Sequence, residues 1–532
     1  MLPRMPKDDG IRKSQTIAFG GYNHTLGAKN GQIWDEHNMC SDHYPVMSPR
    51  LPRLIDNRPI IRNPNGLHCN DGFFYIDGSD FYANGDYKGK LRDEYEYTFR
   101  TMESLGRYIV ILPDKMYYDT IDEVLGNIEL TVTVNASFED GTYAEEEAEA
   151  NTIKAPSGYT WGFKAGDAVE ISGSSVEANN VTIIVREVSG NELRFYPNSF
   201  TNAPANSLTL SRNMPDMDFL CQNENRLWGC KDDTIYSSKL GDIFNWNVFD
   251  GISTDSYAVS VGSAGEFTGC CSFLGYPVFM KEEHIYKVYG DKPSNFQVMA
   301  SASLGTAKGC HNSFAIAGET LFYMSRVGIV AYNGGVPSPI SEAFGQIHYI
   351  DAVGGSDGLR YYVSMRDDTT NVWTLFVYDT RNGIWHKEDY TRILKFGWND
   401  RLYMLSSDGR LLFPGTSRRY AASTEQNVVS MVEFADFTED TQYAANHGAN
   451  HKGTSKLQLR LELDEGTDLR ISMSFDEGEW IVVSDLHATT KKSFYLPIIP
   501  RRSDHFRIRL EGVGMWKLWS LVRESYTGSE LF

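Results

Sequence analysis

Two histidines of this sequence have a spacing that could serve metal chemistry. His447 and His451 are four residues apart, so on a helix they would place two imidazole ligands on one face. They lie in the segment ANHGANHKG, however, where glycine and asparagine do not favour a helix. No phosphate-binding loop, dinucleotide fingerprint, nucleophile elbow or zinc-protease motif occurs elsewhere. The sequence therefore predicts no metal ligand, no cofactor-binding residue and no cofactor.

Arginine and tyrosine residues could form a second kind of site, one that holds an acidic sugar. A retaining sialidase would need an arginine cluster for a carboxylate, with a tyrosine and a glutamate at the axis of the fold. Arg326, Arg366 and Tyr332 are candidates. Nothing in the sequence selects them, and paired catalytic carboxylates cannot be identified among 70 acidic residues. The sequence therefore predicts no catalytic residue, and we expect a protein that is not an enzyme.

Two acidic motifs have structural interpretations. The segment Ser474–Trp480 (SFDEGEW) is one residue short of the S-x-D-x-G-x-x-W box of sialidase-type propellers, and it occurs once. Aspartate and serine side chains of such a box bind the backbone, so we interpret it as a hairpin turn. The run Glu145–Glu147 is interpreted as a solvated loop, with contact to a cation or a basic partner as the alternative.

Composition favours a large β-rich protein. The chain has 532 residues, 13% aromatic residues, 47 glycines and a net charge of −20. This length suggests about two to four domains, and the negative charge argues against a protein that grips nucleic-acid phosphates. Seven cysteines without a CxxC pair indicate buried free thiols made in a reducing cytosol. We find neither a secretory signal nor an apolar run long enough for a membrane span.

One pattern recurs along the chain: an apolar strand, a short polar turn and a second strand that carries an aromatic residue. The segment 225–246, NRLWGCKDDTIYSSKLGDIFNW, is one of seven copies. Apart from one long gap, the copies are roughly 35 to 50 residues apart, which is the blade period of a β-propeller. Trp228 and Tyr236 are therefore interpreted as packing residues, with a ligand role as the alternative. The first strands of the copies lie near Phe74, Ile109, Leu227, Val278, Phe322, Tyr362 and Tyr403.

The sequence thus predicts an all-β protein, with a propeller of about seven blades, an inserted small β-barrel and a C-terminal β-sandwich. Strict alternation of apolar residues between glycine-containing turns predicts the barrel, with four to six strands. Short alternating strands predict the sandwich. Glycines and prolines predict an extended N-terminal arm. Order in such a polar segment usually needs a partner, so we expect the arm to reach a neighbour if the chain is part of a larger assembly. The predicted boundaries are 1–55 for the arm, 56–125 and 215–419 for the propeller, 126–214 for the barrel and 420–532 for the sandwich.

Several stretches resemble structural proteins of tailed-bacteriophage particles. The N-terminal FGGYN and GQIWDEHNMCSDHYPVMSPRLPR are similar to the opening segment of these proteins. The stretches IYSSKLGDIFNWNVF, FLGYPVFMKEEHIYKVYG and LFYMSRVGIVAYNGGVPSPIS are similar to their propeller blades, and the segment 495–529 is similar to their C-terminal sandwich. The resemblance covers most of the chain outside 126–214 and rests on scaffold motifs, so it supplies no catalytic residue.

The resemblance implies a tail nozzle, hub or head-to-tail adaptor subunit, part of the channel for DNA ejection. It implies a homo-oligomeric ring, with a hexamer favoured, and tail or portal proteins as partners. DNA would pass through without specific binding, no membrane would be entered, and the virion would be assembled in the host cytoplasm. The alternative is a glycan-binding or sialidase-like propeller that acts on host surface sugars. A monomer that binds or cleaves a sugar would favour this alternative.

Overall fold

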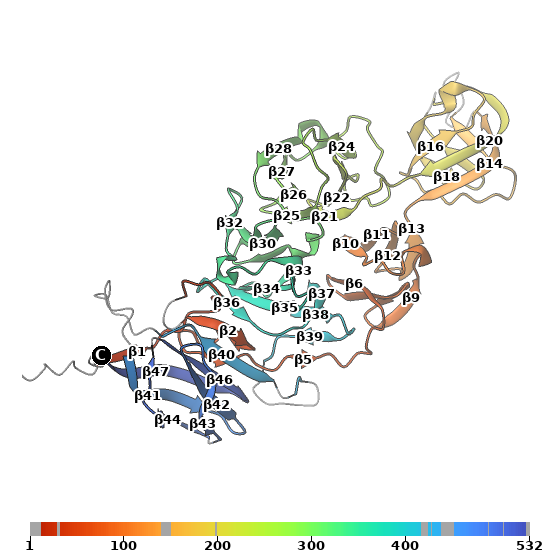
Figure 1. Ribbon diagram of the computed structural model, residues 1–532. Coiled ribbons are helices and arrows are strands. Elements are labelled where there is room, and N and C mark those ends of the chain that lie inside the picture. The colour runs from red at the N-terminus through yellow and green to blue at the C-terminus, as the bar shows by residue number, and fades with distance from the viewer. Residues whose placement is uncertain are drawn as a thin grey trace, which may run out of the picture. The chain divides into compact units, whose positions relative to one another are not determined.

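The computed structural model is built from β-strands, with 3-10 turns as its helical elements in the residues that it describes (Figure 1). These turns are η1 (Asp93–Tyr95), η2 (Glu177–Asn179), η3 (Pro293–Asn295), η4 (His311–Ser313) and η5 (Glu342–Phe344). The structure describes residues 12–28, 32–139, 151–196, 199–416, 424–426, 428–437, 452–487, 489–503 and 505–527.

The chain forms two compact units. The middle unit is Arg62–His311, and the terminal unit combines Met1–Ile61 with Asn312–Phe532. The middle unit contains four antiparallel sheets, each with four strands in chain order. Their strands are β6 (Pro64–Cys69), β7 (Phe73–Asp77), β8 (Asp80–Ala83) and β9 (Asp86–Lys90); β10 (Thr101–Leu105), β11 (Tyr108–Leu112), β12 (Met116–Asp119) and β13 (Val124–Asn127); β21 (Phe219–Asn223), β22 (Arg226–Lys231), β23 (Thr234–Ser237) and β24 (Tyr257–Ser260); and β25 (Gly269–Phe273), β26 (Tyr276–Lys281), β27 (His284–Tyr289) and β28 (Gln297–Ala302).

Local sequence explains these meanders. In the hairpin of β22 and β23, Cys230 pairs with Ile235, and the turn between the strands contains Asp232 with φ of 51°. Asparagine and aspartate tolerate this left-handed conformation, which a tight hairpin requires. The seven copies that the sequence predicts correspond to the second and third strands of seven such meanders. The hairpin interpretation is therefore confirmed.

Apolar cores lie between consecutive sheets of the middle unit. The first strands of neighbouring sheets contact one another, β6 with β10, β10 with β21, and β21 with β25. One core combines Phe81 of β8 with Ile111 of β11, and another combines Trp228 of β22 with Phe279 of β26. A four-stranded sheet cannot bury both faces alone, so stacking face to face is what stabilises propeller blades.

The middle unit also holds the predicted insertion, a seven-stranded sheet around its own core (Figure 1). Its two edge strands, β17 and β18, are consecutive in the chain, so the sheet must curl until its edges come together, as in a small barrel. The core contains Phe138, Phe195 and Leu210. In sheet order the strands are β17 (Thr182–Ile184), β16 (Ala168–Ser172), β20 (Ala203–Arg212), β14 (Leu130–Glu139), β15 (Thr152–Lys154), β19 (Glu192–Arg194) and β18 (Glu187–Ser189).

Three further meanders belong to the terminal unit. The last of them is completed by β5 (Leu54–Ile55), which pairs with β39 although the two strands are far apart in the chain. The strands in order are β29 (Ala315–Ala317), β30 (Thr320–Ser325), β31 (Gly328–Tyr332) and β32 (Ser338–Pro339); β33 (Tyr349–Ser356), β34 (Arg360–Asp367), β35 (Trp373–Asp379) and β36 (Ile384–Lys387); and β37 (Ile393–Trp398), β38 (Leu402–Ser406), β39 (Leu411–Phe413) and β5.

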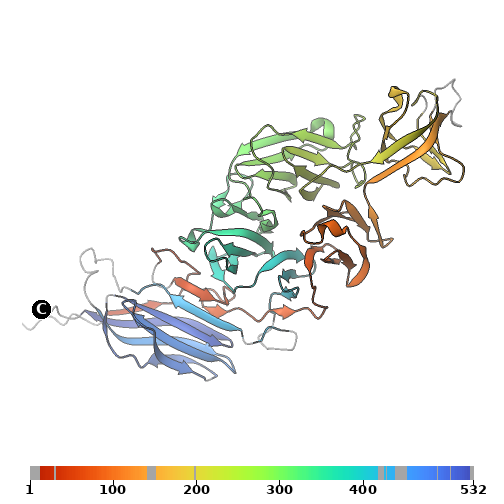
Figure 2. The ribbon, with the colours of Figure 1, turned by 45° about the vertical axis from the view of Figure 1, so that its right-hand side comes forward.

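The terminal unit ends in two five-stranded sheets that face each other across one core (Figure 2). Leu459 and Leu521 of one sheet and Ile471 and Leu510 of the other belong to this core. The first sheet has β1 (Arg12–Thr16), β47 (Trp516–Thr527), β41 (Lys452–Leu463), β44 (Thr490–Leu496) and β45 (Arg502–Ser503). The second has β2 (Ile33–His37), β40 (Val429–Phe434), β46 (Phe506–Val513), β42 (Asp468–Phe475) and β43 (Ile481–Leu486), and β3 (Met39–Cys40) pairs separately with β4 (Ser48–Pro49).

The described part of the N-terminal segment pairs with distant strands of its own chain, which the sequence did not predict. Its strand β1 pairs with β47, β2 pairs with β40, and β5 pairs with β39. The described strands of this segment therefore satisfy backbone hydrogen bonds within their own chain. These pairings could not be predicted, because short strands with few apolar residues carry no periodicity that would reveal their distant partners. The extended arm that reaches a neighbour stays a prediction.

A buried ionic network fastens this segment further. Arg53 is 1% exposed and its guanidinium lies 2.5 Å from Glu388 and 2.8 Å from Asp389, while Arg50 lies 2.7 Å from Glu425. Burial alone would raise the pKa of the Asp389 carboxyl, but the charges of Arg53 and Arg50 outweigh burial and hold that pKa well below its ordinary value. The pKa of Glu425 is lowered by the same balance. The network therefore ties the N-terminal segment to the residues that follow β36 and to Glu425, which precedes β40.

The all-β fold class, with propeller-type sheets, a small inserted barrel and a C-terminal sandwich, is confirmed. The barrel has seven strands, more than the four to six that were predicted, because four of its strands have only three residues each and are too short for a visible alternation. The predicted domain boundaries stay a prediction. Within the described residues, no helix is long and apolar enough to span a membrane.

Candidate binding site

The largest hollow that we describe lies on the first strands of the three meanders of the terminal unit. Its volume is about 500 Å³, which falls within the usual range of ligand-binding pockets. Strands β29, β33 and β37, the residue before β29, the turn that follows β33 and the first residue of β38 supply its walls. The lining residues are Phe314, Ala315, Ile316, Gly354, Gly355, Ser356, Asp357, Gly358, Phe396, Gly397, Trp398 and Leu402.

Glycines shape the wall of the hollow that β33 supplies. A Cβ atom at Gly355 would lie 2.3 Å from Cγ of Phe396, and one at Gly354 would lie 2.4 Å from the carbonyl oxygen of Ser313. Only glycine therefore lets β33 approach β37 and the segment before β29 so closely. A consequence is that β33 presents backbone rather than side chains at these two positions.

Aromatic and aliphatic side chains form the other walls. Trp398 ends β37 and is 52% exposed, which is unusual for the largest apolar side chain. Ile316 of β29 is 46% exposed, whereas Phe396 is 7% exposed and packs in the core behind the hollow. The hollow thus exposes half of an indole beside Phe396, a ring that is already fixed by packing in the core.

Asp357 supplies the carboxylate of the hollow and is held rigidly by the turn between β33 and β34. Its Oδ1 accepts hydrogen bonds from the backbone N–H groups of Leu359 (2.9 Å) and Arg360 (2.7 Å). Its Oδ2 accepts one from the Tyr362 hydroxyl at 3.1 Å. Burial and, to a lesser extent, Asp357 raise the pKa of Tyr362, so this hydroxyl remains a donor at neutral pH. The carboxylate has lone pairs to spare and a fixed position.

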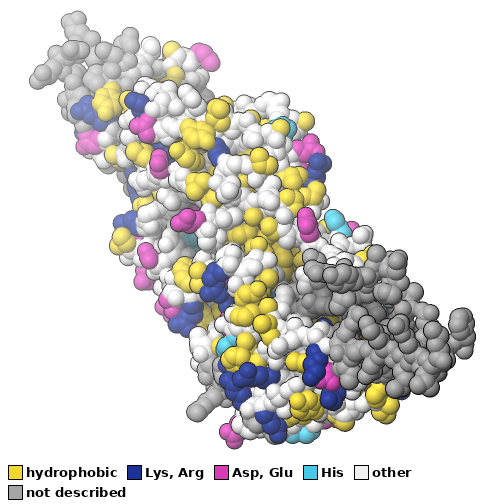
Figure 3. Space-filling model, turned by 90° about the vertical axis from the view of Figure 1, so that its left-hand side faces the viewer, with side chains coloured by type: hydrophobic (Ala, Val, Ile, Leu, Met, Phe, Trp, Pro, Cys, Tyr) yellow, Lys and Arg dark blue, Asp and Glu magenta, His cyan; other side chains and the backbone are white. Residues whose placement is uncertain are grey.

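No lysine, arginine or histidine is found among the described residues that line the hollow. The cations close to it in the sequence are engaged elsewhere: Arg401 lies 2.7 Å from Asp400, and Arg360 lies 2.5 Å from Asp42. Lysine and arginine side chains gather at several places on the face that Figure 3 shows. The net charge of −20 is therefore not spread evenly over the surface. The hollow itself therefore carries negative charge and no neutralising cation.

The sialidase candidates do not form a site. Arg326 is exposed in the turn between β30 and β31, whereas Tyr332 is 2% exposed within β31. Arg366 ends β34 and donates to Asp351 (2.8 Å) and Asn371 (2.5 Å). The three residues lie in different environments, and none lines the Trp398 hollow.

The other predicted motifs have structural roles or lie outside the description. In the segment Ser474–Trp480, the Ser474 hydroxyl donates to the carbonyl of Gly478 at 2.7 Å, between the paired strands β42 and β43. The hairpin interpretation of this box is confirmed. His447, His451 and the run Glu145–Glu147 lie outside the described residues. In the part of the chain that the structure describes, no three metal-ligating side chains cluster.

The cysteines are free thiols in this structure. Cys221, Cys230, Cys270 and Cys310 are buried, and burial raises the pKa of Cys230 and Cys271. A raised pKa keeps these groups as unreactive thiols. The reducing compartment that the sequence suggests stays a prediction.

Sequence reasoning missed the hollow itself. Its signals were the pair Gly354-Gly355 within a strand, Asp357 two residues later, and a tryptophan at the end of β37. Each signal is common alone, and only the fold shows that the three meet.

Comparisons with known proteins give only distant likenesses. No family model matches the chain, and no curated protein matches it. An exo-β-1,3-galactanase from Phanerochaete chrysosporium has a TM-score of 0.21 at 10% identity over 57% of this chain and 94% of its own. The dihydro-heme d1 dehydrogenase NirN has a TM-score of 0.27 at 11% identity over 67% of this chain and 81% of its own. Dipeptidyl peptidase 4 from Porphyromonas gingivalis has a TM-score of 0.23 at 11% identity over 72% and 64%.

These three proteins are enzymes, so the comparisons contradict the expectation that this chain is not an enzyme, and we do not keep it. At such low similarity they identify no catalytic residue in this chain. No match that we report names a protein of a phage particle, and that resemblance is left untested.

Proposed function

We propose that this chain is a glycan-recognising β-propeller protein that holds a neutral saccharide in the Trp398 hollow. The observation that carries the proposal is a half-exposed tryptophan beside a backbone-lined wall and a fixed carboxylate. A pyranose has apolar C–H faces and a rim of hydroxyl groups. The indole of Trp398 can stack on the C–H face of the sugar, and Asp357 together with the glycine backbone can form hydrogen bonds with its hydroxyl groups.

The charge of the hollow selects the class of saccharide. A sialic or uronic acid needs an arginine or lysine partner for its carboxylate, and the described lining residues offer none. Asp357 would repel such a ligand, whereas the hydroxyl groups of a neutral sugar can donate to it. The neutral form of the glycan proposal is therefore better supported than a sialidase-like form.

Hydrolysis would add a requirement to this site. Glycosidases use two carboxyl groups on either side of the bond that is cleaved, about 5 to 10 Å apart. Asp357 is one carboxylate, and a second would have to come from outside the lining residues. The lining residues alone do not decide between binding and hydrolysis, so the experiment measures both binding of a glycan and its cleavage.

The test is a glycan array probed with the full chain, followed by calorimetry and product analysis on the glycans that are bound. Trp398→Ala should weaken binding of neutral glycans by at least about tenfold, because the stacking surface is lost. Tyr495→Ala, which removes an aromatic side chain that is 69% exposed on β44, should bind like the parent chain. Equal binding by Trp398→Ala, or no glycan bound by the parent chain, would contradict the proposal.

A second candidate is the structural subunit of a phage tail that the sequence resemblance implies. The supporting observation is β28, an outer edge strand with the sequence QVMASA, which has no charged side chain and is exposed along most of its length. An unprotected edge of this kind can pair with another chain. Such a subunit would join a homo-oligomeric ring with tail or portal partners in a virion assembled in the host cytoplasm.

Native mass spectrometry of the full chain tests this candidate. A ring of several copies is expected, with Met299→Lys on β28 shifting it toward monomers and Lys308→Met, on an exposed residue outside the strand, leaving it intact. A parent chain that stays monomeric at every concentration would count against the ring and would leave the glycan proposal unaffected.

A further inference from the structure

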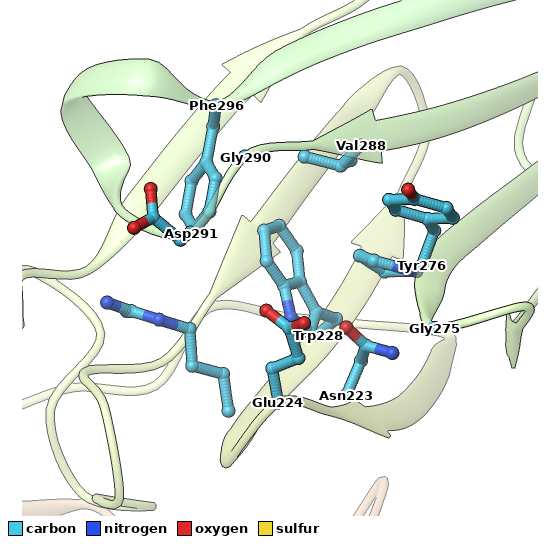
Figure 4. Close-up of a pocket in the computed structure, with 11 residues that line it drawn as sticks. Asn223, Glu224, Trp228, Gly275, Tyr276, Val288, Gly290, Asp291 and Phe296 are labelled. Carbon is cyan, nitrogen blue, oxygen red and sulfur yellow. The ribbon is translucent and has the colours of Figure 1, made fainter.

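A second, much smaller pocket lies in the middle unit between the sheets β21–β24 and β25–β28 (Figure 4). Its volume of about 20 Å³ is enough for one water-sized group. It shares no residue with the Trp398 hollow and belongs to the other unit. The lining residues are Asn223, Glu224, Arg226, Trp228, Gly275, Tyr276, Pro277, Val288, Gly290, Asp291 and Phe296.

Trp228 gives this pocket a hydrogen-bond donor without an acceptor. Its ring is 2% exposed and packs 5.2 Å from the ring of Phe296 and 6.3 Å from that of Phe279, so the expected packing role is confirmed. Its Nε1–H, however, is buried and has no hydrogen-bond partner among the described residues. A buried N–H group without an acceptor destabilises the protein, because it has lost its hydrogen bonds to water and gained none in return. The pocket is therefore built to receive an acceptor atom.

Arg226 does not attract an anion into this space. It is 2% exposed, and its guanidinium donates to the backbone carbonyls of Ser238 (2.8 Å), Asp255 (2.5 Å) and Ser253 (2.9 Å). Its charge also lies over the ring of Phe296, 5.6 Å from the centroid. Arg226 thus stabilises the loop after β23, and its donors are directed at that loop.

Two carboxylates lie on the other walls. Glu224 is exposed in the tight turn between β21 and β22, where its φ is 46°, and in Figure 4 its side chain rises from that turn toward the indole of Trp228. Asp291 accepts a hydrogen bond from Asn295 at 2.5 Å. Two carboxylates disfavour an anionic ligand, and a bare cation could not accept the indole N–H.

We infer that this pocket is a binding site for one hydroxyl group of a neutral sugar or polyol. A hydroxyl group meets both requirements, as a water molecule also does, because its oxygen accepts from Nε1–H of Trp228 while its proton is donated to Glu224. Tyr276 beside the pocket favours a hydroxyl that belongs to a larger ligand. Tyr276, which is 38% exposed, lies at the same pocket and gives the remainder of a sugar ring a surface to rest on. The site stands independently of the Trp398 hollow.

The test uses the full chain labelled with 5-fluorotryptophan. The variant Trp228→Phe identifies the fluorine resonance of Trp228 by its loss, and glycerol, galactose, fucose, glucose and mannose are then titrated separately. We expect at least one of them to shift this resonance saturably, and to do so equally in Trp398→Ala. Loss of the charged acceptor in Glu224→Ala should weaken that binding about tenfold.

Glu319→Ala is the matched control. Glu319 is exposed, has φ of 65° and occupies the equivalent turn between β29 and β30, so it shares the backbone strain of Glu224 without the pocket. This variant should bind like the parent chain. A Trp228 resonance that none of the five compounds moves would overturn the inference, as would equal shifts in Glu224→Ala and the parent chain. If Trp228→Phe does not fold, the resonance is identified by its broadening from a spin label on Glu224→Cys, which lies at the same pocket.

Discussion

The Trp398 hollow and the Trp228 pocket use the same residue types in opposite ways. Trp398 ends its strand and is 52% exposed, whereas Trp228 lies within β22 and is 2% exposed. The first offers the face of an indole and the second offers only its N–H. Each has a carboxylate nearby, Asp357 fixed by three donors and Glu224 in an exposed turn. Burial, more than residue type, thus decides which part of a tryptophan can meet a ligand.

The two sites also differ in what supports them. The hollow belongs to the terminal unit, whose meanders are fastened by β5 and by the network around Arg53. The pocket belongs to the middle unit, whose four meanders are each formed by strands that follow one another in the chain. Changes to the N-terminal segment should therefore affect one site and spare the other.

Arg53→Met should give the largest effect. Removing one partner of a buried ionic network leaves the other charges unpaired, and we expect about 3–5 kcal/mol lower stability of the terminal unit. Hydrogen exchange would report the loss in β5, β37 and β39, with little change in the middle unit. Arg401→Met is the control, because Arg401 is half exposed and pairs with the exposed Asp400. Equal loss in both units would break the comparison.

Gly355→Ala should have the second-largest effect on stability. The added Cβ would lie 2.3 Å from Cγ of Phe396, so β33 and β37 must separate, at about 1–3 kcal/mol in stability. Chemical denaturation measures the loss, and saccharide titration should show weaker binding in the hollow. Gly27→Ala, at a position with open space around it, should be neutral. Normal stability of Gly355→Ala would show that the close approach of the strands is not required.

Lowering the pH should cause part of the loss of stability that we expect for Arg53→Met. The folded-state pKa values of Asp389 and Glu425 are lowered, so the stability that they contribute is present above their unfolded pKa values, about 4. It is lost as pH falls through the lower folded-state values, by about 1.4 kcal/mol for each unit of pKa difference. Denaturation between pH 7 and pH 3 measures this loss, which Glu425→Gln should reduce. Stability that rises below pH 4 would refute the assignment.

Asp357→Asn should give the smallest effect and concerns the ligand rather than the fold. The amide oxygen can still accept from the N–H groups of Leu359 and Arg360, so the turn should persist. Loss of the negative charge should improve binding of sialylated or uronate glycans by a few-fold, at most about 1 kcal/mol. The array measures this shift, with Asp400→Asn as the exposed control. Preference of the parent chain for acidic glycans would reverse the charge argument.

Much of the repeat could be predicted from the sequence, because second and third strands carry apolar runs around polar turns. The predicted positions at Phe74, Leu227 and Tyr362 all fall on second strands of meanders. First strands were harder to recognise, since β33 contains two glycines and a bulge that interrupts its alternation. The hollow lies on these first strands, so the elements that predict the fold are not the ones that build the site.

Long-range pairing could not be predicted. Leu54 and Ile55 form a two-residue strand, which has no period to detect, and β1 is polar throughout. Trp228 was assigned correctly to the core, but the unsatisfied state of its Nε1 depends on where backbone carbonyls lie and has no signal in the sequence. The ionic partners of Arg53 are more than 300 residues away in the chain.

The pairing of β1 with β47 sets an order for biosynthesis. The ribosome releases the N-terminal segment first, yet the strands that receive it, β39, β40 and β47, are translated last. The middle unit can fold while translation continues. Leu54 and its neighbours, however, have no strand to pair with until several hundred more codons have been translated. Chaperones that shield nascent chains would therefore be expected to act on this protein chiefly through its first sixty residues.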